Sequence, residues 1–161
     1  MSPEGAVEPI RGTVTVRIDP ARAFELFTEH MGSWWPVDAY SRAVSEFEGE
    51  GIEVTRLEFQ ARTGGSILEH TSDGRTLPWG EVIAWHPPHR VVMAWHPHSL
   101  PEPPTELEVT FTALEGGTRV ELEHGGWERV SEGFRQAIHE VYVRGWITTL
   151  DRFVAASDRS L

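Results

Sequence analysis

The stretch PWGEVIAWHPPHRVVMAWHPH, residues 78–98, decides the fold of this chain because it has the pattern of a β-hairpin. HPPH at 86–89 is a turn sequence, and the segments on either side of it are rich in Val, Ile and Trp, which favour strands. A turn at this place pairs residues whose numbers sum to about 175 across the two strands. Gly80 is then expected opposite Trp95, where the glycine leaves room for the indole.

This pairing divides the hairpin into two faces, and it also sets Val82 opposite Met93 and Trp85 opposite Arg90. One face is wholly apolar and consists of Gly80, Val82, Ala84, Val91, Met93 and Trp95. The other face is mixed and consists of Trp79, Glu81, Ile83, Trp85, Arg90, Val92 and His96. Because a sheet with one buried side requires such a separation, we expect the apolar face to look inward, toward a long C-terminal helix.

The mixed face groups two tryptophans with an arginine, namely Trp79, Trp85 and Arg90. Two interpretations stay open for this cluster. It is either a stack of indole and guanidinium groups that covers the sheet, or a surface that binds a protein partner.

The segments before the hairpin read as a strand, a helix and a corner. TVTVRI at 13–18 alternates between apolar and polar residues, as a half-buried strand does. DPARAFELF at 19–27 begins with an aspartate suited to cap a helix and a proline suited to its first turn. Gly32 and the tryptophan-rich SWWP at 33–36 end this helical segment.

Short strands between turns fill the middle of the chain, from about residue 44 to 124, and predict an antiparallel meander. ELEVTFTA at 106–113 and TRVELEH at 118–124 alternate most clearly. The apolar positions change phase between Val54 and Leu57, which we interpret as a β-bulge.

A helix is predicted over 132–156, with Ser131 as its cap. Its expected apolar stripe consists of Phe134, Ala137, Ile138, Val141, Gly145, Thr148 and Thr149, flanked by Tyr142, Trp146, Leu150 and Phe153. The stripe narrows to small residues in the second half of the helix. It therefore fits a helix that lies over a hollow, or one in close contact with a sheet.

Composition excludes several classes of function. The 161 residues contain no Cys, and all 14 basic residues are Arg, so disulfides, thiolate ligands and lysine chemistry are ruled out. A net charge of −11 disfavours nucleic acid and anionic membranes as partners. Residues 1–9 carry no secretory signal, and we expect them to be disordered or extended in a cytoplasmic protein.

Motifs of catalysis and metal binding are missing from the sequence. It has no HExxH, GxSxG or strand-linked GxGxxG pattern. His96 and His98 would share one side of a strand, but a zinc site needs three or four converging ligands, and only Glu81 or His70 could join them. We therefore predict no metal and no cofactor.

His124 falls on the inward face of its predicted strand, next to Gly125 and Gly126. A buried imidazole needs a hydrogen-bond partner. Three interpretations stay open: a core histidine with its partner, the polar anchor of a ligand pocket, or a general base.

The sequence resembles the START-like (SRPBCC) helix-grip superfamily, and within it the bacterial heat-shock-protein-90 ATPase activator homologue-like family. The resemblance is carried by VRIDPARAFELFTEHMGSWWP, GGSILEHTSDGRTLPWGEVIAWHPPHRVVMAWHP, TELEVTFTALEGGTRVELEHGGWE and GWITTLDRFVA. It implies an α+β fold in which a curved antiparallel sheet wraps around a long C-terminal helix, with two short helices after the first strand. It implies a single domain over 10–156 and a tail over 157–161.

The resemblance also implies a cavity between the sheet and the long helix that takes apolar or aromatic small molecules. Its expected lining is Trp35, Val82, Met93, Trp95, Val109, Phe111, Leu122, His124, Phe134, Ile138, Val141 and Tyr142. The aliphatic members would serve equally well in a filled core. Trp35, Trp95, His124 and Tyr142 favour a pocket because they combine an apolar body with a polar tip.

Three functions follow from this resemblance. The first, which we favour, is a small-molecule-binding protein without catalysis. The second is an enzyme of the polyketide cyclase or aromatase kind, which needs two converging polar groups, whereas only His124 is suitably placed. The third is a chaperone-linked protein-interaction module, acting as a homodimer or with another protein.

Overall fold

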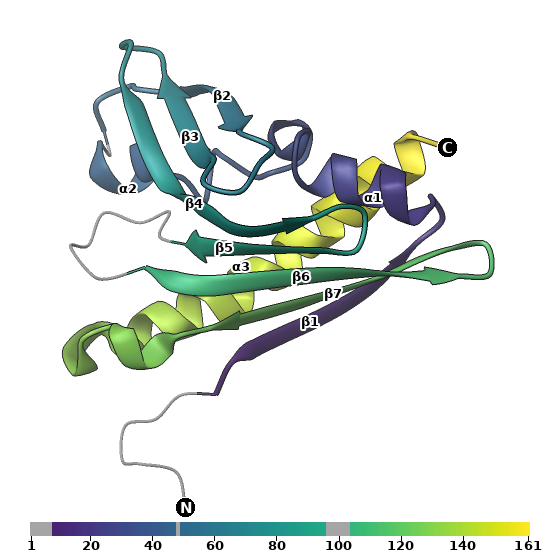
Figure 1. The fold of residues 1–161 in the computed structure, drawn as a ribbon. Helices are drawn as coiled ribbons and strands as arrows, with labels where there is room; N and C mark the ends of the chain where they lie inside the picture. The colour runs from purple at the N-terminus through teal and green to yellow at the C-terminus, as the bar shows by residue number, and fades with distance from the viewer. Residues whose placement is uncertain (1–7, 48, 96–103) are drawn as a thin grey trace, which may run out of the picture.

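The computed structural model describes residues 8–47, 49–95 and 104–161, and in it one antiparallel sheet curves around a long helix (Figure 1). The strands are β1 (Ile10–Val16), β2 (Val54–Phe59), β3 (Ser66–Thr71), β4 (Thr76–His86), β5 (Arg90–Trp95), β6 (Thr105–Leu114) and β7 (Gly117–Gly125). The helices are α1 (Pro20–Phe27), α2 (Arg42–Glu46) and α3 (Glu132–Arg159), with short 3₁₀ turns η1 (Met31–Ser33) and η2 (Trp127–Arg129). This is the helix-grip architecture that the resemblance implied.

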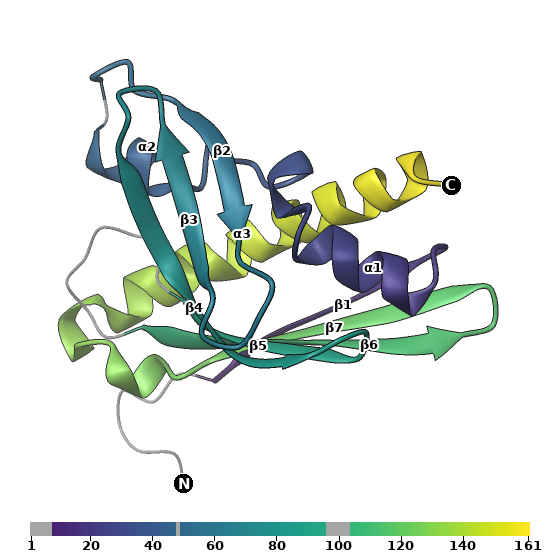
Figure 2. The same cartoon turned by 45° about the horizontal axis from the view of Figure 1, so that its top comes forward.

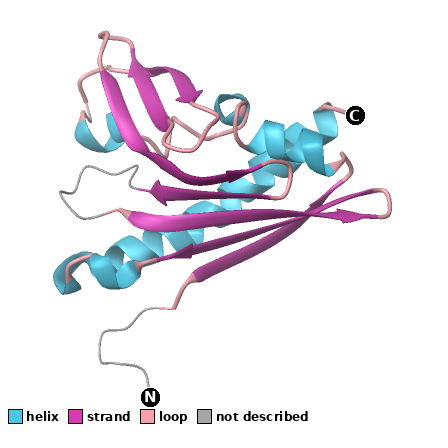
Figure 3. Ribbon diagram, viewed as in Figure 1, coloured by secondary structure: helices cyan, strands magenta, loops and turns pink. Residues whose placement is uncertain are grey.

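The order of the strands in the sheet is β1-β7-β6-β5-β4-β3-β2, so the first strand pairs with the last and the others follow in a meander. α3 lies along the concave side of the sheet, and α1 lies against the same side near the C-terminal end of α3 (Figure 3). β2, β3 and the adjoining part of β4 turn away from the other strands (Figure 2). Within the described part of the chain, no helix is long and apolar enough to cross a membrane.

The start of α1 is fixed by Asp19, as the sequence predicts. Its carboxylate accepts a hydrogen bond from the backbone N–H of Arg22 at 2.8 Å, and Pro20 occupies the first turn. Phe24 and Phe27 on the inner side of α1 are buried against the core.

The hairpin of β4 and β5 has the predicted register at its open end. Gly80 pairs with Trp95, Val82 pairs with Met93, and Trp95 is completely buried. A Cβ atom on Gly80 would lie 1.8 Å from the carbonyl oxygen of Ala94, so only glycine fits at this position.

The register changes at Ile83, and the pairing expected near the turn is wrong. Ala84 pairs with Val92 and Trp85 pairs with Val91, so Trp85 does not face Arg90. Ile83 is an extra residue, a β-bulge, which exposes its own side chain and changes the phase of the residues that follow.

A second bulge turns Trp79 inward. Ile67 pairs with Gly80 and its neighbour Leu68 pairs with Pro78, which leaves Trp79 as the extra residue. Trp79 is fully buried. The prediction that it faces outward is therefore wrong.

The expected outward cluster of Trp79, Trp85 and Arg90 does not form. The Trp85 ring is partly buried against Phe24 and Phe59, with ring centroids 4.9 and 6.0 Å away. Arg90 pairs with Glu108 on β6 instead of stacking on an indole. The bulge predicted between Val54 and Leu57 is confirmed, because the register shifts between Val54 and Arg56.

α3 begins after Ser131, as predicted, and extends to Arg159 rather than ending at 156. Its buried residues are Gly145, Trp146, Thr149, Leu150, Phe153, Ala156 and Ser157. The expected stripe is therefore rotated, since its members Phe134, Ala137, Val141 and Thr148 are exposed. The residues predicted to flank the stripe supply most of the contact with the sheet.

Candidate ligand pocket

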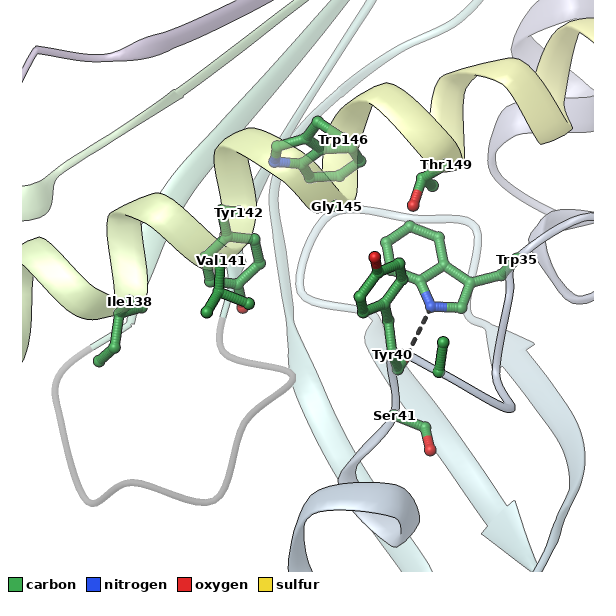
Figure 4. Close-up of a pocket in the computed structure, with 10 residues that line it drawn as sticks. Trp35, Tyr40, Ser41, Ile138, Val141, Tyr142, Gly145, Trp146 and Thr149 are labelled. Atoms are coloured by element: carbon green, nitrogen blue, oxygen red, sulfur yellow. Dashed lines mark hydrogen bonds between the residues drawn. The ribbon is translucent and has the colours of Figure 1, made fainter.

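A pocket of about 260 Å³ lies between α3 and the segment that joins η1 to α2 (Figure 4). It is lined by Trp35, Ala39, Tyr40, Ser41, Ile138, Val141, Tyr142, Gly145, Trp146 and Thr149. None of these ten side chains carries a charge. An apolar wall with a few polar groups is the usual make-up of a small-molecule site.

Trp35 shapes the loop side of the pocket. Its indole N–H donates to the carbonyl oxygen of Tyr40 at 2.7 Å, and the backbone N–H of Tyr40 donates to the carbonyl of Pro36 at 2.9 Å. These two bonds close residues 36–40 into a turn. On its other side Trp35 meets Trp146 of α3 edge to face, with ring centroids 5.7 Å apart.

A buried carboxylate holds the segment after Tyr40 against the sheet. Glu69 on β3 is fully buried, and its two oxygens accept hydrogen bonds from the backbone N–H groups of Arg42 and Ala43 at 2.8 and 2.7 Å. The indole N–H of Trp79 donates to the same carboxylate at 2.7 Å. Three donors thus replace the lost hydration of the carboxylate. Glu69 thereby fixes the first turn of α2, which directly follows the pocket lining.

Gly145 makes room for Tyr40 on the opposite wall. A Cβ atom at Gly145 would lie 3.6 Å from Cζ of Tyr40, so the phenol end of the ring rests directly over this point of the helix. At this distance a methyl group would make an ordinary van der Waals contact with the ring, whereas a larger side chain would take up space in the pocket.

Behind the pocket, a chain of hydrogen bonds joins α3 to the sheet. The indole N–H of Trp146 donates to Nδ1 of His124 at 3.0 Å. Nε2 of His124 is 2.7 Å from the hydroxyl of Thr105, which donates to the carbonyl oxygen of Trp95 at 2.8 Å. His124 and Thr105 are both buried.

Four tryptophans pack together between this network and the loop wall of the pocket, and one of them, Trp146, belongs to both the network and the pocket lining. Trp35 contacts Trp79, Trp95 and Trp146 with ring centroids 5.2, 5.6 and 5.7 Å away. The indole N–H of Trp95 is buried and has no hydrogen-bond acceptor among the described residues. The Trp95 ring packs against the rings of Trp35, Trp79 and Trp146.

The structure divides the twelve expected lining residues into three groups. Trp35, Ile138, Val141 and Tyr142 line the pocket. Phe134 lies at the surface with 50% of its area exposed. The remaining seven are at most 3% exposed and pack in the core, namely Val82, Met93, Trp95, Val109, Phe111, Leu122 and His124.

Sequence reasoning missed the loop wall of the pocket. Ala39, Tyr40 and Ser41 had no periodic pattern that would assign them to a face. Their signal was indirect: the SWWP corner places Trp35 next to a short turn, and Gly145 and Thr149 mark where the helix narrows.

Titratable groups are scarce in the pocket. Burial raises the pKa of the Tyr142 hydroxyl, which therefore stays protonated at neutral pH. Its ring packs edge to face on His124, with centroids 4.7 Å apart. Among the described residues, no group of three or more His, Asp or Glu side chains converges as a metal site would require, and His96 and His98 lie outside those residues.

Comparison with known proteins identifies relatives along nearly the whole chain. The family model of Activator of Hsp90 ATPase homolog 1-like proteins matches residues 17–158. No curated protein matches the sequence significantly. An anthrahydroquino-gamma-pyrone synthase is 29% identical, with a TM-score of 0.58 over 94% of this chain and 97% of that one.

Two other solved structures share the fold at lower identity. A protein from Mesorhizobium loti is 15% identical, with a TM-score of 0.67 over 95% of this chain and 98% of that chain. The Aha1 dimer from Colwellia psychrerythraea is 15% identical, with a TM-score of 0.59 over 89% of this chain and 91% of that chain.

Proposed function

The chain belongs to the family of Activator of Hsp90 ATPase homolog 1-like proteins, and from this premise we propose that it binds an apolar or aromatic small molecule and has no catalytic activity of its own. The binding site is the pocket between α3 and residues 35–41. The observation that carries the proposal is the uncharged, largely apolar lining of this pocket, beside a sheet interior that side chains fill. An apolar hollow open to water gains free energy when a ligand displaces that water.

The size of the pocket limits the ligand. A cavity of about 150 Å³ with apolar walls holds one benzene ring. A pocket of about 260 Å³ therefore suits a molecule of about two fused rings. The rings of Trp35, Tyr40 and Trp146 offer such a molecule aromatic surfaces to pack against.

Catalysis of ring closure is the second candidate, favoured by the 29% identity to the synthase. Such a reaction needs a group that removes a proton and one that returns it. Among the described residues no carboxylate or imidazole lines the pocket, and both nitrogens of His124 are engaged behind Trp146. Binding without catalysis therefore accounts for these side chains better.

The third candidate function is a protein-interaction module, and the surface cluster that favoured it does not exist in the structure. Trp79 is buried and Trp85 packs against its own chain, so neither offers the exposed aromatic anchor on which that hypothesis rested. A dimer is recorded for the relative from Colwellia psychrerythraea.

Native mass spectrometry of protein purified from its own host tests the proposal. We expect an extra mass that is released on denaturation and is lost in Gly145→Leu, whose side chain would fill the space next to Tyr40. Gly133→Leu is the matched control, because nothing lies within 4 Å of a Cβ atom at Gly133 on the same helix. An extra mass retained by Gly145→Leu would place the ligand elsewhere. Absence of any extra mass, together with no saturable binding of two-ring aromatics, would contradict the proposal.

A further inference from the structure

Two hydroxyl groups face each other across the pocket, and neither is bonded within the part of the chain that the structure describes. The first belongs to Tyr40, whose ring lies with Cζ over Gly145 of α3. The second belongs to Thr149, one helical turn further along the same face. In Figure 4 the two hydroxyls point toward one another. Neither forms a hydrogen bond with any residue that the structure describes.

Thr149 is unusual among the buried hydroxyl residues. It is 1% exposed, yet its hydroxyl does not bond to a backbone carbonyl of its own helix. By contrast, the hydroxyl of Thr28 donates to the carbonyl of Phe24 at 2.7 Å, and that of Ser157 donates to the carbonyl of Val154 at 2.6 Å. A hydroxyl that makes no bond within the protein can bond water or a ligand, so its position against a pocket calls for an explanation.

Other polar groups of the lining are already engaged within the protein. The indole N–H groups of Trp35 and Trp146 donate to Tyr40 and His124. The hydroxyl of Ser41 accepts from the backbone N–H of Val44 at 3.2 Å, as the cap of α2. The two indole N–H groups are therefore not available to a ligand, and the Ser41 hydroxyl has one of its acceptor positions occupied. The hydroxyls of Tyr40 and Thr149 are available.

We propose that Tyr40 and Thr149 form a hydroxyl pair that anchors a neutral aromatic ligand through a single hydroxyl or carbonyl group. The inference rests on the proposed function and names the ligand class for that pocket. Each hydroxyl can donate or accept, so the pair suits a phenol or a ring ketone. A charged group is disfavoured because none of the ten described lining side chains carries a charge to pair with it, and an anion is opposed further by the net charge of −11.

Three probes with the same two-ring skeleton test separately the need for a hydroxyl group and the need for a neutral ligand at pH 7. They are 2-naphthol, which is neutral and hydroxylated, naphthalene, which is apolar, and 2-naphthoate, which is anionic. Quenching of tryptophan fluorescence reports binding, since Trp35 and Trp146 form part of the wall. We expect 2-naphthol to bind about tenfold more tightly than naphthalene, with 2-naphthoate the weakest of the three.

Tyr40→Phe and Thr149→Val remove each hydroxyl with little change of shape. Each is expected to weaken 2-naphthol binding by about two- to tenfold and to leave naphthalene binding unchanged. Thr148→Val, on the exposed side of the same helix turn, should change neither affinity. An unchanged circular dichroism spectrum verifies the fold of each variant.

The possible results have distinct meanings. Equal affinity of the wild-type protein for naphthol and naphthalene, or equal losses for both probes in Tyr40→Phe and Thr149→Val, would overturn the hydroxyl anchor while leaving the pocket as a binding site. Failure of all three probes to bind the wild-type protein would overturn the proposed function and the anchor together.

Discussion

Trp146 on α3 donates its indole N–H to Nδ1 of His124 on β7 at 3.0 Å. Because an indole nitrogen is only a donor, Nδ1 must be the unprotonated nitrogen of the imidazole. The proton of the neutral ring is then on Nε2, which donates a hydrogen bond to the Thr105 hydroxyl at 2.7 Å. The Thr105 hydroxyl in turn donates a hydrogen bond to the carbonyl oxygen of Trp95. The direction of every bond in this chain follows from that one indole.

Replacing His124 with Phe should destabilise the protein by about 2–4 kcal/mol. The substitution removes an acceptor from Trp146 and a partner from Thr105, and each buried group left without a partner costs about 1–3 kcal/mol. Urea denaturation measures the change in the free energy of unfolding. Glu121→Phe, at an exposed position of the same strand, is the control for the effect of a phenylalanine in β7. A loss below about 0.5 kcal/mol would show that the network contributes little.

Glu69→Gln should loosen the wall of the pocket as well as the fold. An amide presents one oxygen where the carboxylate presents two, and its NH₂ group would face the N–H of Arg42 or Ala43. We expect a loss of about 2–4 kcal/mol in the free energy of unfolding, because one buried donor loses its acceptor and a second donor opposes it.

The Glu69→Gln variant is also expected to bind 2-naphthol more weakly than the wild-type protein, since α2 directly follows Tyr40 and Ser41. Glu81→Gln, at an exposed site on β4, is the matched control for both measurements. Weaker naphthol binding with unchanged stability would mean that Glu69 acts on the pocket by another route.

The hairpin shows what the sequence could and could not predict. The opposition of Gly80 and Trp95 followed from the turn and from the need for space beside an indole, and the structure confirms it. The bulges at Trp79 and Ile83 could not be predicted from the sequence. The residues on both sides of each bulge are apolar, so a shift between the two faces does not change the alternation of apolar and polar residues. Two bulges were enough to turn both Trp79 and Trp85 inward.

The position of the pocket depends on which face of α3 packs against the sheet, and the apolar periodicity of this helix did not decide between two faces. Apolar residues occur on two adjoining faces of the helix, and the sequence favoured the face of Phe134 and Val141. The structure buries the face of Trp146 and Phe153 instead, because these larger rings fill the space under the curved sheet. The pocket is the remaining space between α3 and the 35–41 loop, a contact that no local pattern predicts.

Gly80→Ala should disrupt the hairpin that decides the fold. The new Cβ atom would lie 1.8 Å from the carbonyl oxygen of Ala94, and a backbone atom cannot move aside without breaking the pairing of β4 and β5. We expect a loss of at least about 3 kcal/mol in the free energy of unfolding. Thermal denaturation followed by circular dichroism measures it. Ala84→Gly in the same strand is the control, and retention of wild-type stability in Gly80→Ala would contradict the register.

Gly145→Ala should have the opposite effect on stability. Its Cβ atom would lie 3.6 Å from Cζ of Tyr40, which is an ordinary van der Waals distance, and the residue is in the middle of a 28-residue helix. Alanine is favoured over glycine inside a helix by about 0.5–1 kcal/mol, so the free energy of unfolding should rise by about that amount. Because the methyl group takes space beside Tyr40 and Thr149, naphthol binding should weaken in the same variant.

Gly133→Ala, near the first turn of α3 and away from the pocket, should leave naphthol binding unchanged. If Gly145→Ala instead destabilised the protein, Tyr40 and the helix would already be in tighter contact than the structure shows, and the space assigned to a ligand would be smaller.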